Sequence, residues 1–351
     1  MNMNLNNTKL LLKEKYRNND ISSYAVMVYK KGEKQTLMSP DVDEYTYFDV
    51  ASMGKVLVTS TLILQAIDRN LLKLENTLQD FFANVPDEKK NITVKQLLTH
   101  MSGIVRHQLS SQAAEKGNDF VAEEILSHPL AFKPYENCIY SCNGMILLGF
   151  ILEKIYGKTL EEIYNIHIKK PLGLKRTSFV IDMDEPNAAV CYRWERTENS
   201  KHRFDDENIL VLKKAAGSGG QQSCLHDIER FAESVLRKDE KLYSNKMFEL
   251  AEKNYNPHNG DKRGLGYLVV DENFRQTGDL FPAGSFGHCG HSGQSFFINR
   301  EQDMYVIILT NATRHANMKN NFKGYDYGEI KKMREDIHNM ILRDLVENKE
   351  R

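Results

Sequence analysis

The 351-residue chain has no long hydrophobic run. Its longest apolar stretch, residues 145–152, is far shorter than the roughly 20 apolar residues that a membrane-spanning helix needs. Near its N-terminus only Leu10–Leu12 are consecutively apolar, whereas a secretory signal needs an apolar stretch of roughly 7–15 residues and a small-residue cleavage site. We therefore expect no membrane partner and a cytoplasmic location.

The chain also lacks a surplus of charge of either sign. Its 47 lysines and arginines nearly balance 48 aspartates and glutamates, so no long-range field favours a nucleic acid as partner. The five cysteines are odd in number and show no C-x-x-C spacing, which favours reduced thiols over a zinc site or a disulfide framework. No internal repeat or low-complexity linker is present, and the length suits one large domain or two intimately packed ones.

Strand patterns occur near both ends of the chain and enclose a helical middle. They lie at residues 22–30 and 35–38, and again at 266–270, 285–290, 295–299 and 304–310. Helical periodicity dominates from residue 56 to about 255 and returns at 327–346. We therefore predict an α/β (α+β) fold, with one antiparallel sheet formed from both ends and flanked by helices. Residues 1–55 and 262–351 would form the sheet subdomain, and residues 56–261 a mainly helical one.

A serine and a lysine are spaced three residues apart in Ser52-Met53-Gly54-Lys55, where an aromatic and β-branched run gives way to an apolar helical stretch. At the start of a helix such a pair lies on one face, so the ammonium can reach the hydroxyl that it must help to deprotonate. The positive end of the helix would also favour negative charge at Ser52. By itself the spacing is equally compatible with Ser52 as an N-cap and Lys55 as a solvated first-turn residue.

Five further segments follow in an order that resembles the serine β-lactamase and penicillin-binding-protein superfamily, whose nucleophile motif is S-x-x-K. The resemblance extends from about residue 22 to residue 315, and the third motif has its histidine form, G-H-x-G-x-S-G. It implies a β-lactamase/transpeptidase-like fold with the site in the groove between sheet and helical parts. The segments are residues 92–103 (ITVKQLLTHMSG), 132–149 (FKP…YSC…LLG), 171–179 (PLGL…TSF), 219–231 (GGQQS…D…F) and 287–293 (GHCGHSG).

Tyr140 stands where the family's motif tyrosine exchanges protons with the nucleophile and the leaving group. A phenol has a pKa near 10, so an adjacent ammonium such as Lys55 would have to lower it. The chain departs from the family at Cys142, where the usual asparagine holds the acyl-amide group of the substrate, because a thiol is a weak hydrogen-bond partner. Asn143 would replace that contact only if the loop shifted by one residue. Cys142 itself is either a small buried residue or a second nucleophile.

His288 occupies the first position of the third motif, where penicillin-destroying members of the family mostly have lysine. Histidine titrates near 6.5, so at neutral pH it offers a partial charge and a hydrogen bond. Within the family this residue suggests esterases, amidases and peptidases that act on D-configured or small acyl substrates. Gly290 shares the strand face of His288 and would let a substrate backbone approach closely. The resemblance assigns the oxyanion hole to the backbone N–H groups of Ser52 and His291.

Two other chemistries fit the sequence less well. His288 and His291 are three residues apart on a strand and point to opposite faces, which argues against a zinc site. An α/β-hydrolase would need a G-x-S-x-G elbow, and the chain has none. His100, within the second segment, looks structural, as a histidine bonded to loop backbone. We therefore expect neither a metal nor another cofactor.

The sequence thus predicts a serine hydrolase that takes a small-molecule acyl substrate. Ser52 would attack a carbonyl, Lys55 and Tyr140 would manage its proton, and Cys142, Asn143, His288 and Gly290 would contact the substrate. Small esters or amides, including D-amino-acid amides and peptides, are favoured over β-lactams. Three alternatives remain open: an acyltransferase with the same residues, a penicillin-binding or sensory protein that acylates and stalls, and a retired enzyme that serves as a binding module. The oligomeric state is not predicted.

Overall fold

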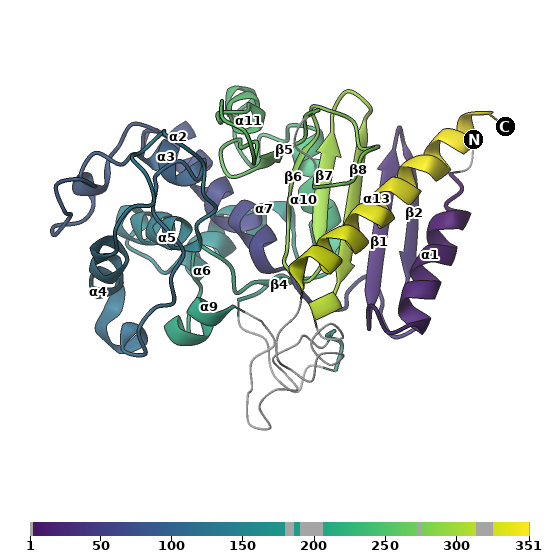
Figure 1. The fold of residues 1–351 in the computed structure, drawn as a ribbon, viewed down its shortest axis with the longest axis horizontal. Coiled ribbons are helices and arrows are strands. Elements are labelled where there is room, and N and C mark those ends of the chain that lie inside the picture. The colour runs from purple at the N-terminus through teal and green to yellow at the C-terminus, as the bar shows by residue number, and fades with distance from the viewer. Residues whose placement is uncertain (1–2, 180–185, 190–205, 273–275, 314–325, 351) are drawn as a thin grey trace.

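The computed structural model describes residues 3–179, 186–189, 206–272, 276–313 and 326–350. Its centre is a six-stranded antiparallel sheet in the order β2-β1-β8-β7-β6-β5, so strands from the two ends of the chain lie side by side (Figure 1). The predicted fold class is confirmed. The strands are β1 (Tyr24–Lys30), β2 (Glu33–Met38), β5 (Leu268–Val269), β6 (Phe286–Cys289), β7 (Ser295–Asn299) and β8 (Met304–Thr310).

The longest strand pairing of this sheet joins β1 and β8, which align over seven residues from Tyr24 opposite Thr310 to Lys30 opposite Met304. β1 turns into β2 through Lys31 and Gly32, whose φ angles of 49° and 86° are those of the tight hairpin turn that suits the twist of two strands. β2 is the edge strand and is only partly buried, whereas all seven residues of β8 are buried. The buried pair therefore anchors the sheet, as a run of β-branched and apolar residues predicts.

Helices cover both faces of the sheet. α1 (Asn6–Arg17) and α13 (Tyr327–Glu350) lie together on one face, and α13 crosses in front of the strands in Figure 1. α10 (Leu225–Leu236) packs on the other face. Alternate residues of β1 divide between these two layers: Val26 and Val28 face the cluster that includes α13, and Ala25 and Met27 face the opposite one.

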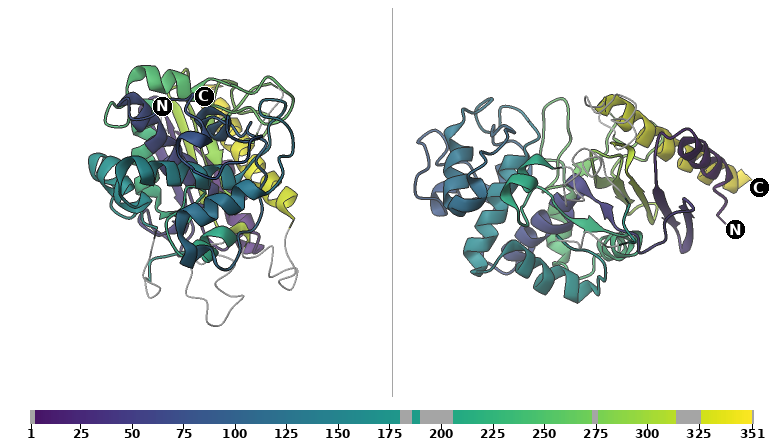
Figure 2. Two further views of the ribbon diagram at one scale, coloured as in Figure 1. Left: turned by 90° about the vertical axis from the view of Figure 1, so that its left-hand side faces the viewer. Right: turned by 90° about the horizontal axis from the view of Figure 1, so that it is seen from below.

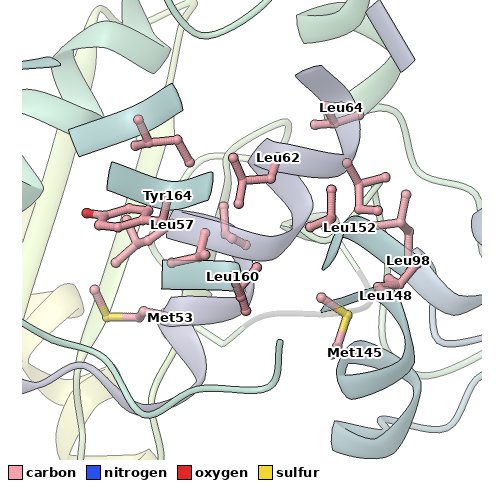
Figure 3. Packing of buried hydrophobic residues seen from close by; sticks show 14 of the residues in the cluster. Met53, Leu57, Leu62, Leu64, Leu98, Met145, Leu148, Leu152, Leu160 and Tyr164 are labelled. Carbon is pink, nitrogen blue, oxygen red and sulfur yellow. The ribbon is translucent and has the colours of Figure 1, made fainter. Parts of the chain in front are cut away.

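The buried side chains form two clusters. The larger one, which includes Ala25 and Met27 of β1, continues into the core of the helical part, which lies beside the sheet (Figure 2). Leu57 and Leu62, which follow Ser52 in the chain, pack there with Leu148 of α5 and Leu160 of α6 (Figure 3). The site-bearing segment is therefore held by this shared core. The helices of this part are α2 (Thr61–Asp68), α3 (Val94–Leu98), α4 (Ala113–Ser127), α5 (Cys142–Tyr156), α6 (Leu160–Tyr164), α7 (Lys170–Leu172), α9 (Glu207–Leu212) and α11 (Asn245–Glu252).

Short elements interrupt this pattern where the chain approaches the candidate nucleophile. The stretch expected to be one helix from residue 56 begins as a π-helix, η2 (Lys55–Ser60), and becomes α-helical only at α2. A 3₁₀ turn, η1 (Ala51–Met53), precedes it, and β3 (Phe48–Asp49) pairs with β4 (Gln222–Ser223) in a separate small sheet. π-helical turns occur frequently at functional sites. The remaining short turns are η3 (Leu78–Asp80) and η4 (Asn165–Lys169).

None of the helices in the described parts of the chain is long and apolar enough to cross a bilayer.

Candidate active site

Ser52 lies on a sharp turn that is fixed from both sides. On one side, β3 is paired with β4, and the Asp49 carboxylate accepts a 2.8 Å hydrogen bond from the backbone N–H of Ala51. On the other side, the Gln294 amide donates to the backbone carbonyl of Asp49 at 2.6 Å and so connects this turn to the third motif. Ala51 has a φ of 46°, a conformation that residues other than glycine adopt rarely. These bonds hold the partly exposed Ser52 on η1.

Lys55 and Tyr140 meet at the Ser52 hydroxyl. Lys55 is fully buried and donates hydrogen bonds to Ser52 Oγ at 3.0 Å and to the Ser218 carbonyl at 2.6 Å. The Tyr140 hydroxyl donates to Ser52 Oγ at 2.6 Å, and Lys55 Nζ lies 5.1 Å from the centroid of the Tyr140 ring. The three side chains that the sequence selects thus form one hydrogen-bonded group, although Tyr140 comes from the loop before α5.

The electrostatics of this group favour a charged lysine. Burial lowers the pKa of Lys55, but the electrostatic interactions with the Cys142 and Tyr140 side chains outweigh this effect, and the pKa lies above its ordinary 10.5. Burial raises the pKa of Tyr140 above its ordinary 10, and the positive charge of Lys55 opposes this rise without reversing it. Lys55 is therefore a fixed cation, and Tyr140 is a phenol that donates to Ser52 Oγ.

His100 holds the backbone on both sides of Tyr140. Its carbonyl accepts from the N–H of Ile139 at 2.9 Å, and its Nδ1 accepts from the N–H of Ser141 at 3.2 Å. Its ring packs against the Tyr140 ring with centroids 4.9 Å apart. Burial lowers the pKa of His100 well below 6.5, so the ring is neutral and Nδ1 stays an acceptor. His100 is bonded to loop backbone, as the sequence indicates.

The third motif lies directly against the nucleophile turn. A Cβ added at Gly290 would come within 3.2 Å of the Ala51 Cβ and would overlap the Gln294 side chain, so only glycine fits between them. The Gly290 N–H donates to the Gln294 carbonyl at 2.8 Å, which starts a turn beyond β6. His291 follows on this turn and is partly exposed. Its backbone N–H remains a prediction as the second oxyanion donor.

His288 is buried beside Tyr140, with an exposed fraction of 2% and ring centroids 6.4 Å apart. Its Nδ1 lies 2.9 Å from the Cys289 carbonyl, which can only accept, so Nδ1 carries the proton. Burial, together with the charges of Arg263 and Lys55, lowers the pKa of His288 well below 6.5. At neutral pH His288 therefore presents a bare acceptor, Nε2, which makes no hydrogen bond to any described residue. The partial positive charge expected from the sequence is not available.

Cys142 and Asn143 begin α5 and are both buried. The Cys142 thiol is close enough to Lys55 and Tyr140 to influence both of their pKa values. The Asn143 amide points elsewhere: its Nδ2 lies 2.7 Å from Nδ1 of His107, and its Oδ1 accepts from Nδ2 of Asn208 at 3.2 Å. A contact between Asn143 and the substrate stays a prediction, and it would have to be made beside these two partners.

Arg263 is a site residue that the sequence reasoning missed. Its exposed fraction is 3%, and its guanidinium carbon lies 5.4 Å from the centroid of the Tyr140 ring. It forms an ion pair with Asp261, whereas its Nε and Nη1 groups make no hydrogen bond to described residues. Two glycines in Arg263-Gly264-Leu265-Gly266, just before β5, are the signal that could have marked this segment as one that approaches another backbone closely.

A metal centre is not formed by the described residues, which contain no group of three or more His, Cys, Asp or Glu side chains arranged to hold an ion.

Comparisons with known proteins show the family of this chain. Residues 10–323 match the family model described as Beta-lactamase. The Bacillus subtilis protein named "Putative penicillin-binding protein PbpX" is 26% identical over 278 residues, which make up 78% of this chain but only 64% of that protein. The Escherichia coli O157:H7 protein named "Putative D-alanyl-D-alanine carboxypeptidase" is 25% identical over 327 residues, which cover 80% of this chain and 73% of that protein.

Solved structures show the same fold at lower sequence identity. EstCE1, described as a hydrolase with promiscuous acyltransferase activity, superposes with a TM-score of 0.71 at 19% identity and covers 94% of this chain and 98% of its own.

Proposed function

Because this chain belongs to the beta-lactamase family of serine hydrolases, we propose that it is a serine acyl hydrolase whose nucleophile is Ser52. The observation that carries the proposal is the pair of hydrogen bonds at Ser52 Oγ, from Lys55 Nζ at 3.0 Å and from the Tyr140 hydroxyl at 2.6 Å. A nucleophile bonded to a proton-exchanging group, which is in turn held by a third residue, is the arrangement that covalent catalysis requires. His100 holds Tyr140 through the backbone of the neighbouring residues and through contact between the two rings.

Acylation begins from the form in which Tyr140 is a phenolate. The phenolate takes the Ser52 proton while Oγ attacks the carbonyl carbon of the substrate, and Lys55 stays charged beside both oxygens. We assign the stabilisation of the negative charge that develops on the carbonyl oxygen to the backbone N–H groups of Ser52 and His291. Tyr140 then gives its proton to the leaving group, which departs from the acyl-enzyme. In the second half, the phenolate takes a proton from water while the water oxygen attacks the acyl carbon. The bond between the acyl carbon and Ser52 Oγ then breaks, Tyr140 returns the proton to Oγ, and the acid leaves.

The substrate class we propose is small esters or amides, with D-amino-acid amides and peptides included and β-lactams poorly used. A penicillin needs a partner for its side-chain amide, and the buried Cys142 thiol is a weak one. The neutral His288 ring supplies no charge for the penicillin carboxylate. An ester needs neither contact. The name of the Escherichia coli relative, a carboxypeptidase for D-alanyl-D-alanine, supports the inclusion of D-amino-acid substrates.

The second candidate function is acyl transfer, in which an alcohol or amine replaces water in the second half of the reaction. The structural neighbour EstCE1, a hydrolase with promiscuous acyltransferase activity, favours it. The same Ser52, Lys55 and Tyr140 would serve both reactions. Product analysis in the presence of added alcohol distinguishes them, because transfer yields a new ester whereas hydrolysis yields the free acid.

The experiment that tests the proposal is turnover of p-nitrophenyl acetate, combined with mass spectrometry after reaction with a fluorophosphonate. We expect the label on Ser52, and we expect Ser52→Ala to lose the label and at least roughly four powers of ten in kcat. The thermal unfolding midpoint should stay nearly unchanged, because the side chain is small and partly exposed. Full activity in the alanine variant, or a label on Cys142, would refute the assignment. A single burst without turnover would indicate a protein that acylates and stalls.

A further inference from the structure

Two permanent cations lie close to the Tyr140 ring. Lys55 Nζ is 5.1 Å from the ring centroid and the guanidinium carbon of Arg263 is 5.4 Å from it. Both cations are almost completely buried, with exposed fractions of 0% and 3%. Inside a protein two charges interact more strongly than in water, so a cation at this distance has a large effect on the neighbouring phenol.

The fold brings Arg263 to this place from a distant part of the chain. A Cβ at Gly264 would overlap the Ala251 carbonyl, and one at Gly266 would overlap the Ser60 side chain. The two glycines therefore let the segment press against the helical part next to η2 and α11. The Arg263 N–H donates to Asn254 at 3.1 Å, which fixes the backbone from which the guanidinium extends.

Arg263 is also incompletely paired. Its Nη2 bonds to Asp261, whose side chain is partly exposed, while Nε and Nη1 have no hydrogen-bond partner among the described residues. The thiol of Cys138 lies nearby, and burial raises the pKa of that thiol, so it does not neutralise the guanidinium at neutral pH. The positive charge of Arg263 also helps to lower the pKa values of the neighbouring His100 and His288.

We propose that Arg263 is a positioning residue of the reaction: together with Lys55 it favours the phenolate form of Tyr140, which burial disfavours, and it supplies the second cation that the third motif does not. His288 cannot supply it, because that ring is neutral. This inference rests on the proposed role of Tyr140 as the group that takes the Ser52 proton. The titratable and charged groups around Tyr140 are Lys55 on η2, Cys142 on α5, His100 after α3, His288 on β6, and Arg263 with Asp261 before β5.

The test is the pH dependence of fluorophosphonate labelling of Ser52, measured as a second-order rate constant. The probe carries no carboxylate, so it reports the state of the catalytic group and not electrostatic recognition of an anionic substrate. We expect Arg263→Met to move the midpoint of the acid limb about one pH unit higher, because loss of a cation within 4–6 Å raises the pKa of an acid. Arg263→Lys should move it much less. Asp261→Asn, which frees the guanidinium from its counter-ion, should move it lower.

Arg237→Met is the matched control. Arg237 also lies 5.4 Å from the centroid of a tyrosine ring, that of Tyr29, and it is outside the site. Its loss should leave the labelling profile unchanged. Thermal unfolding of each variant shows whether it folds, and if Arg263→Met does not fold, the downward shift expected for Asp261→Asn still decides the question. Coincident midpoints for wild type and the folded Arg263 and Asp261 variants would overturn the inference.

A second measurement separates this inference from the proposed function. The absorbance difference between the protein and its Tyr140→Phe variant during a pH titration reports Tyr140 ionisation without any activity. We expect the same upward shift in the Arg263→Met background. If Ser52 were not labelled at all but this shift were present, the proposed function would fail and the effect of Arg263 on Tyr140 would stand. If Ser52 were labelled normally but neither the labelling midpoint nor the Tyr140 titration shifted in Arg263→Met, the proposed function would stand and the effect of Arg263 on Tyr140 would be refuted.

Discussion

The two sides of the candidate site differ in how their polar atoms are bonded. On the nucleophile side, defined as Ser52, Lys55 and Tyr140, every functional atom takes part in a hydrogen bond. On the third-motif side, defined as His288, Gly290 and Arg263, His288 Nε2 and two nitrogens of Arg263 make no hydrogen bond to the described residues. Buried polar atoms without partners are rare in proteins and cost about 1–3 kcal/mol each.

This contrast indicates different roles for the two sides. A fully bonded group is ordered before the substrate arrives, which suits the proton transfers that need fixed geometry. Buried atoms without partners keep unused hydrogen-bonding capacity and, in Arg263, an incompletely paired charge, which suits selection of substrates and tuning of neighbours. We therefore expect changes on the nucleophile side to reduce all activities together, and changes on the third-motif side to alter substrate preference and pH dependence.

The largest effect is expected on the nucleophile side. Lys55→Ala and Tyr140→Phe should each lower kcat by roughly 10²–10⁴ for every substrate, the usual contribution of a general acid–base group. Because the two residues act as one unit, the double variant should be little worse than the poorer single one. Steady-state kinetics with p-nitrophenyl acetate measure this. A kcat within a factor of a few of wild type would remove that residue from the mechanism.

A smaller effect is expected where a substrate amide and carboxylate would lie. Cys142→Asn combined with His288→Lys should raise penicillin G turnover relative to ester turnover by roughly 10–100-fold, because two restored contacts with net contributions of about 0.5–1.5 kcal/mol each add to about 1–3 kcal/mol. The ratio of kcat/KM values for the two substrates is the measurement. The single variants serve as controls that apportion the gain. If wild-type protein already hydrolyses penicillin G as fast as a good ester, our reading of both residues is wrong.

The smallest effect concerns stability in acid. His100 and His288 have pKa values well below 6.5 in the folded chain, whereas the unfolded chain takes up protons at about 6.5. The stability that depends on these neutral rings is therefore complete above pH 6.5 and is lost progressively as the pH falls below it. At pH 5 the loss is about 2 kcal/mol for each histidine that stays neutral when folded.

His288→Asn should remove the contribution of one histidine to this loss of unfolding free energy in acid. We expect urea unfolding to show a decrease in unfolding free energy between pH 7.5 and pH 5 that is smaller than in wild type by about 2 kcal/mol. His100→Asn is the informative comparison, because it removes the same titration but also the bond from Ser141 that holds the nucleophile side. It should lower stability at both pH values. An unchanged acid loss in His288→Asn would mean that this ring is protonated in the folded protein.

Local patterns in the sequence determined the fold class and selected the nucleophile. Alternation of apolar residues and turn signals located all six strands of the main sheet to within a few residues. A strand with one buried face has alternating apolar residues, and a strand with two buried faces has a continuous apolar run. The spacing of Ser52 and Lys55 implied contact for a similar reason: three residues in a helical turn return to the same face. The ordered segments up to residue 293 added the family, which the match to residues 10–323 confirms.

Only the tertiary structure decided which groups surround Tyr140 and how they are charged. Arg263 is far from Tyr140 in the chain, and no spacing rule relates a loop before β5 to a loop before α5; their contact follows from how the sheet packs on the helical part. The same packing buries His288 and thereby removes its charge, and it turns Asn143 toward His107 and Asn208. Periodicity and spacing report contacts along one element, whereas pKa values and side-chain partners depend on every element that closes around a residue.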